Sequence, residues 1–211
     1  YPWHDSLSFK EGFLDRSIVN EYLEILWECI ELNWPEVIRS KRVANKFITC
    51  DLDYPFDPAI YSLNLTMKKS LKLFLLNGEI RKGLNLFRNY FYALFRWSVK
   101  DDYRNAIDWI MDVNEEAGNR VAFYFITHKT SIFDSNIDFQ SKPMKELISS
   151  INIRGHEIGI HPGYETYNNY KMFKKSVSTL HKIFSELEIS QAKVGGRQHL
   201  LRWDPVITPS L

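Results

Sequence analysis

The sequence predicts an α/β protein with parallel strands, and two of its features lead to that prediction. Four short apolar segments are separated by longer stretches of helical periodicity, so each connection between strands holds a helix. Residues 121–127 are apolar almost without interruption, which is typical of a strand buried on both faces of a parallel sheet.

The other elements follow from periodicity and from the residues that end helices. Gly118 is expected to end one helix, and Asn77-Gly78 interrupts another. The predicted helices cover residues 18–32, 59–100 with that interruption, 103–117, 143–152 and 167–187. The predicted strands cover residues 46–51, 121–127, 157–160 and 192–194. The aromatic-rich helices of residues 59–100 could face lipid, but their scattered basic residues favour an insertion that packs on the main domain.

Composition narrows the class of protein. The chain has 211 residues, 45% hydrophobic and 15% aromatic, which is enough for a globular core. Its 27 basic and 26 acidic residues give a net charge of +1, so charge provides no reason for nucleic acid or an anionic membrane as main partner. No run of about 18 apolar residues predicts a membrane span. Cys29 and Cys50 are too few for a disulfide scaffold and are expected to be buried free thiols.

Two aspartates stand at the end of the first predicted strand. Alternation along a strand places Asp51 and Asp53 on one side and Leu52 on the other. Two carboxylates this close resist double ionisation unless a cation lies between them, and then one can ligate a metal while the other takes a proton from water. The pair can equally cap the turn before Pro55, and the sequence leaves both interpretations open.

Histidines flank the third predicted strand. His161 follows it directly, at a strand exit like that of the aspartates, and is a candidate metal ligand. His156 precedes the strand, which spans about 13 Å at about 3.3 Å per residue, so it is expected to be structural and to share no metal with His161. Arg197 follows the fourth strand and can clamp a carboxylate. His128 and His199 are further candidates.

Three segments of the chain resemble, in order, the first three motifs of the polysaccharide deacetylases, carbohydrate esterase family four. The resemblance covers most of the chain from Arg16 onward and is closest to a branch with a helical insertion after the first motif, here at residues 58–100. The segments are Phe47-Ile-Thr-Cys-Asp-Leu-Asp53, Gly155-His-Glu-Ile-Gly-Ile-His-Pro162 and Gly196-Arg-Gln-His-Leu-Leu-Arg202.

The resemblance implies a distorted (β/α) barrel, here incomplete, and metal-dependent removal of N-acetyl groups from amino sugars of a polysaccharide or glycan precursor. It implies Asp51 as general base, Asp53 and His161 as metal ligands, and Arg197 as the residue that orients the base. Where the family has a second histidine, this chain has Glu165, which is then expected as the third ligand. Where the family has Arg-x-Pro-Tyr, this chain has Arg197-Gln198-His199-Leu200.

These implications define the expected protein: a single deacetylase-like domain over residues 1–211 that is truncated at its C-terminus, with the insertion inside it. The expected cofactor is a divalent metal, zinc before others, and the expected partner is an N-acetylated glycan, with no nucleic acid and no membrane span. The general acid is expected beyond Leu211, or from His128 or His199. The compartment and the oligomeric state stay open, with a cytoplasmic location favoured.

Two other functions remain possible on the sequence. Glu165 and Leu200 depart from the family pattern and favour an inactive glycan-binding or scaffolding domain in polysaccharide biosynthesis. A different metal-dependent hydrolase on a similar barrel is a further alternative, because a fold does not fix its reaction.

Overall fold

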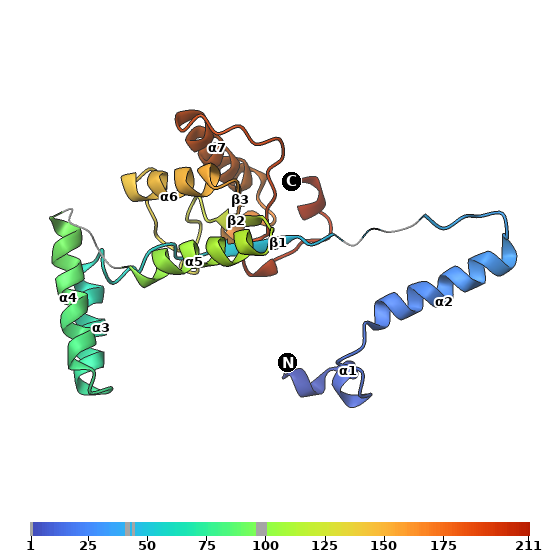
Figure 1. Ribbon diagram of the computed structural model, residues 1–211, viewed down its shortest axis with the longest axis horizontal. Coiled ribbons are helices and arrows are strands. Elements are labelled where there is room, and N and C mark those ends of the chain that lie inside the picture. Colours follow the sequence, from blue (N-terminus) through green and yellow to red (C-terminus); the bar gives the residue numbers. More distant parts are fainter. Residues whose placement is uncertain (1, 41–42, 44, 96–100) are drawn as a thin grey trace. The chain divides into compact units, whose positions relative to one another are not determined.

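The computed structural model describes residues 2–40, 43, 45–95 and 101–211 of the chain (Figure 1). It divides into two compact units, residues 1–45 and residues 46–211. The larger unit is of mixed α/β type, and all three strands of the described sheet belong to it.

Seven α-helices are present in the described parts of the chain. They are α1 (Leu7–Lys10), α2 (Ile18–Asn33), α3 (Leu63–Leu75), α4 (Ile80–Leu94), α5 (Asp102–Glu116), α6 (Lys142–Ile153) and α7 (Tyr170–Glu186). Each predicted helix is present, and the predicted interruption at Asn77-Gly78 separates α3 from α4, with Gly78 at a φ of +66°. The part of the helical prediction over residues 96–100 lies outside the described residues.

The smaller unit contains α1 and α2 and is described by itself. Ser6 caps α1 by accepting a hydrogen bond from the backbone N–H of Phe9. The apolar positions of α2 recur at helical spacing, as expected, and the helix ends where Trp34 donates its backbone N–H to Ile30. Its Cys29 is exposed, which corrects the expectation of a buried thiol, because the turn that carries it is not covered by other described residues of its unit.

The sheet consists of β1 (Ile48–Leu52), β2 (Val121–Phe125) and β3 (Glu157–Ile160), all parallel and in the order β1-β2-β3. The whole of β2 is buried, as its uninterrupted apolar run predicts. Its side chains at Val121, Phe123 and Phe125 enter the main core, which α5, α6 and α7 complete with Met111, Ile148, Ile183 and their neighbours. Because the strands are parallel, their carboxyl ends lie along one edge of the sheet.

The fourth predicted strand, residues 192–194, is wrong in its position. The segment pairs with β3 two residues later, through a single parallel bridge between Ile160 and Gly196. Ile160 donates its backbone N–H to Gly195, and Arg197 donates its own to Ile160. A Cβ at Gly196 would lie 2.7 Å from the Ile160 side chain, so the missing side chain allows this approach. This shift places Arg197 and the residues after it directly at the end of the pairing with β3, at the carboxyl edge of the sheet.

The segment that holds α3 and α4 leaves and re-enters the α/β unit at one place. The carboxylate of Asp101, at the N-terminus of α5, accepts hydrogen bonds from the backbone N–H groups of Asp57, Tyr103 and Arg104. Two ends that meet in this way are the geometry expected of an inserted segment. The apolar side chains of the hairpin, however, are largely exposed, whereas the sequence favoured their packing on the main domain.

Two further expectations concern the whole described chain. Cys50 is free, as expected, but only half-buried, and burial raises the pKa of its thiol. Within the described residues, every helix is too short or too polar to cross a bilayer.

Candidate metal centre

Asp53 and His161 meet at the carboxyl edge of the sheet. Asp53 directly follows β1 and His161 directly follows β3, and their backbones are set by neighbouring strands, since His161 donates its N–H to Phe125 at the end of β2. The Nε2 atom of His161 lies 3.4 Å from Oδ1 of Asp53. This is the juxtaposition that two strand exits in one parallel sheet predict.

The Asp53 side chain is partly exposed to solvent, and one of its carboxylate oxygens is buried beside His161. Its side chain is 49% exposed, yet Oδ1 is buried and accepts no hydrogen bond. Contact with His161 holds the pKa of Asp53 below its usual value. Burial opposes a positive charge on His161, but the Asp53 carboxylate and the Arg197 carbonyl outweigh it and raise the pKa of the imidazole. A buried carboxylate oxygen with no donor of its own is a position where a cation is favourable.

His161 is held in a defined tautomer. Its Nδ1 faces the backbone carbonyl of Arg197, which can only accept a hydrogen bond, so Nδ1 carries the proton of the neutral ring. Nε2 then presents its lone pair beside Asp53. Metal-ligating histidines are oriented in this way, with the second ring nitrogen donating to a carbonyl or a carboxylate.

His199 is the third member of the site. Its Nδ1 lies 2.7 Å from Oδ1 of Asp134, and because a carboxylate can only accept, Nδ1 donates and Nε2 is left uncommitted. His199 and Asp134 are both buried, with side chains 5% and 0% exposed. The ring centroids of His161 and His199 lie 5.0 Å apart. The neutral ring of His199 therefore has the same tautomer as that of His161, with a carboxylate in place of the carbonyl as the acceptor for Nδ1.

Asp134 is the centre of a network that positions His199. Its Oδ2 accepts from the backbone and hydroxyl of Thr130 and from the backbone of Ser131, and its Oδ1 accepts from the backbone of Tyr164 as well as from His199. Burial opposes ionisation of Asp134, but these donors outweigh it and hold its pKa below the usual value. Asp134 is thus an ionised acceptor that fixes the histidine ring.

The loop of His199 is fastened to the loop of His161. His199 donates its backbone N–H to Pro162, and the amide of Gln198 donates to the carbonyls of Pro162 and Gly163. Leu200 and Leu201, which follow His199, both have positive φ, 52° and 53°, a conformation that costs a residue with a side chain about 1–3 kcal/mol. A strained turn held by several hydrogen bonds keeps the His199 ring in one place.

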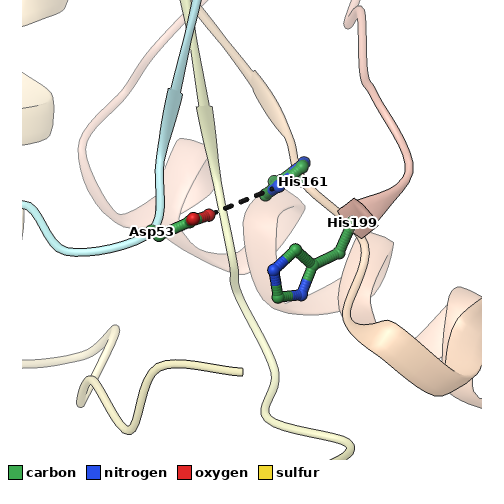
Figure 2. A group of neighbouring side chains, drawn as sticks. All are labelled: Asp53, His161 and His199. Carbon is green, nitrogen blue, oxygen red and sulfur yellow. Dashed lines mark ion pairs between the residues drawn. The ribbon is translucent and has the colours of Figure 1, made fainter. Parts of the chain in front are cut away.

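Together, Asp53, His161 and His199 form a group whose possible ligand atoms all lie within 4.8 Å of one another. Figure 2 shows the three side chains directed toward one another from three separate segments. Two ligand atoms bound to one tetrahedral zinc at about 2.0–2.1 Å lie about 3.4 Å apart, and the distance between Asp53 and His161 is 3.4 Å. Two histidines and a carboxylate, each histidine with an outer partner, suit zinc.

Asp51 lies beside this group and contacts Arg197. One guanidinium nitrogen of Arg197 is 3.0 Å from each oxygen of Asp51, and the other donates to the Thr49 hydroxyl at 2.7 Å. The expected clamp between Arg197 and a carboxylate is confirmed. Thr49 and Asp51 belong to the same side of β1, so one strand sets both contacts.

The remaining sequence candidates lie elsewhere. Glu165, expected as the third ligand, is not part of the group; its carboxylate instead lies 3.3 Å from a guanidinium nitrogen of Arg202. His156 is structural, as expected: its Nδ1 accepts from Val121 at 3.1 Å, and its Nε2 lies 3.0 Å from Glu115. His128 is likewise outside the group, and burial lowers the pKa of its ring.

The spacing of residues in the sequence could have identified His199 as a member of this group, although the motif of the deacetylases has no histidine at this position. Asp51 and Asp53 are two positions apart at the end of β1, and Arg197 and His199 are two positions apart after the bridge to β3. In extended backbone, residues two apart lie on one side. Each segment thus supplies one member of the Asp51–Arg197 pair and one member of the histidine–carboxylate group.

Comparison with known proteins adds one finding. A family of unknown function, DUF7033, matches residues 1–35, which belong to the smaller unit. No curated protein and no solved structure matches the chain significantly.

Proposed function

We propose that this chain is a metal-dependent deacetylase that removes N-acetyl groups from amino sugars of a polysaccharide or glycan precursor. The observation that carries the proposal is the position of the Asp51–Arg197 pair next to the group of Asp53, His161 and His199. A deacetylase of this kind needs a metal site and a separate carboxylate base, and here β1 carries the base, Asp51, and is followed directly by one metal ligand, Asp53.

In the proposed site, Asp53, His161 and His199 hold a divalent metal, with zinc as the favoured ion. Zinc supplies polarisation of the acetyl carbonyl and a water whose pKa falls towards about 7. Arg197, which also donates to the Thr49 hydroxyl, keeps the Asp51 carboxylate in place, and Asp51 accepts the proton of the attacking water. Asp134 and the Arg197 carbonyl keep the two histidine rings in the orientation that presents Nε2.

His199 changes the assignment of roles that the sequence suggested. As a ligand it replaces Glu165, so the departure at residue 165 is no longer an argument for an inactive domain. As a ligand it also does not serve as the acid that protonates the leaving amine. His128 is then the remaining one of the two histidines that the sequence offered for this acid. The three-stranded parallel sheet, with its bridge at Gly196, is proposed to be part of a distorted (β/α) barrel.

The test is Asp51→Asn in the full-length protein. We expect metal content to be unchanged and release of acetate from an N-acetylated oligosaccharide to fall by about 10²–10⁴-fold, the usual contribution of a positioned acid or base. Asp15→Asn, an exposed aspartate of the smaller unit, is the matched control and should leave both unchanged. Full activity of Asp51→Asn would disprove the assignment of the base, and a protein that binds glycan but no metal would show a binding domain instead.

A further inference from the structure

The α3–α4 hairpin has an interior of small and polar residues. In the described part of these two helices the buried residues are Thr66, Ser70 and Gly83. The Ser70 hydroxyl donates to the carbonyl of Gly83 at 3.1 Å, and a Cβ at Gly83 would lie 2.3 Å from the Phe74 ring. Because Gly83 has no side chain, the helices approach closely there and the Phe74 ring packs against the Gly83 backbone.

Several large apolar side chains of the two helices are nevertheless exposed. On α3, Met67, Leu71 and Leu75 recur every four residues, and on α4, Leu84 and Phe91 occupy one side. Each of these five is at least half exposed, for example Leu71 at 55% and Leu84 at 57%. We call them the apolar face of the hairpin.

A hollow is lined by part of this face, Met67 and Leu71, together with Phe87 of α4. It has a volume of about 280 Å³ and lies between the helices, and its lining consists of Met67, Lys68, Leu71, Phe74 and Phe87. Side chains of both helices line it, and all but one are apolar. Contiguous exposed apolar surface of this kind marks an interaction site in a stable protein.

The charge of the hairpin differs from that of the chain. Residues 63–95 contain six basic side chains and one acidic one, a net charge of +5, whereas the chain as a whole carries +1. Residues three or four apart are neighbours on a helix. By that spacing Lys68 and Lys72 border Leu71 and Leu75, and Arg81 and Arg88 border Leu84. Cations thus flank the apolar face on both helices.

We propose that the α3–α4 hairpin binds the surface of an anionic lipid bilayer. The apolar face enters the boundary between headgroups and acyl chains, and the flanking lysines and arginines extend to the lipid phosphates. The two helices, of 13 and 15 residues, lie in the plane of the surface rather than across it. The charge favours an anionic lipid surface, because the hairpin carries six basic side chains and one acidic one, and four of the cations border the apolar face.

The experiment is flotation of the whole chain with vesicles of neutral phosphatidylcholine and with vesicles that also contain one third phosphatidylglycerol. We expect binding to the anionic vesicles and at least tenfold weaker binding to the neutral ones. Arg81→Gln/Arg88→Gln should weaken anionic binding roughly 30-fold, because each basic residue near an anionic surface contributes about 1 kcal/mol and a tenfold change corresponds to about 1.4 kcal/mol. Lys171→Gln/Lys174→Gln removes two exposed charges from α7 and should change binding less than twofold.

A second variant separates lipid binding from other uses of the face. Leu71→Ser/Leu84→Ser alters two exposed side chains, so it should retain its helical circular dichroism while losing binding to both vesicle types. Equal binding of this variant and the parent chain would overturn the proposal. So would a parent chain that stays in solution with both vesicle types, or one that forms a dimer that the same substitutions dissociate.

Discussion

The sheet, with its carboxyl edge, and the α3–α4 hairpin distribute polar and apolar side chains in opposite ways. In the sheet, apolar residues such as Phe123 fill the interior and polar groups gather at one edge, where the buried His199 and Asp134 contact each other. In the hairpin, Ser70 and Gly83 fill the interior and leucines face outward. The sheet edge leaves one buried carboxylate oxygen, Asp53 Oδ1, without a donor, whereas the hairpin presents an apolar surface that another molecule can cover.

The largest expected effect is on Zn²⁺ affinity, which should depend on Asp53, His161 and His199 more than on the residues around them. His161→Ala and His199→Ala should each weaken Zn²⁺ binding by more than about 100-fold, beyond the range for loss of an outer partner. Glu165→Gln is the matched control and should leave affinity within twofold, because Glu165 contacts Arg202 and lies outside the group. Competition with a chromophoric chelator measures this. Strong loss on Glu165→Gln and none on His199→Ala would restore the ligand set that the sequence suggested.

A phenylalanine should contribute much to the free energy of unfolding in the core of the sheet and little on the apolar face of the hairpin. Phe123→Ala removes a fully buried ring from the core and should lower the free energy of unfolding by about 3–5 kcal/mol. Phe91→Ala removes an exposed ring from the hairpin and should change it by less than about 0.5 kcal/mol. Urea unfolding followed by circular dichroism compares them. Comparable losses would mean that the apolar face is packed against protein.

A third substitution tests whether the buried network at the sheet edge serves the histidine. Asp134→Asn retains an acceptor but loses the charge that faces His199, and should weaken Zn²⁺ binding about 10–100-fold. The double variant Asp134→Asn/His199→Ala should bind Zn²⁺ no more weakly than His199→Ala alone, because Asp134 acts through that ring. Fully additive losses in the chelator assay would show that Asp134 acts by another route.

The smallest effect concerns the close approach inside the hairpin. Gly83→Ala places a Cβ against the Phe74 ring and should destabilise the hairpin by about 1–2 kcal/mol, within the usual range for overpacking. Hydrogen exchange of α3 and α4 amides should quicken while that of β2 amides is unchanged. In a Phe74→Ala background the same substitution should cost less than half as much. An unchanged cost would show that the ring is not what the new methyl group meets.

The fold was predictable wherever one pattern dominates. The uninterrupted apolar run of β2 and the helical spacing of α5, α6 and α7 each predict an element that the structure contains. The strand at residues 192–194 was misplaced because a segment with two glycines has no pattern of its own, and its position comes from the approach of Gly196 to Ile160. Likewise, a near-neutral whole chain conceals the local charge of the hairpin.

The sequence by itself predicted the parallel α/β arrangement, the proximity of Asp53 and His161, and a contact between Arg197 and a carboxylate, because strand exits in a parallel sheet meet at one edge. Only the tertiary structure decided the rest. His199 joins the group because Asp134, sixty-five residues earlier in the chain, fixes its ring. Leu71 and Leu84 are exposed, whereas the close contact between α3 and α4 is made by Ser70, Gly83 and the Phe74 ring. Both outcomes depend on contacts between distant residues, which no local pattern of apolar and polar residues encodes.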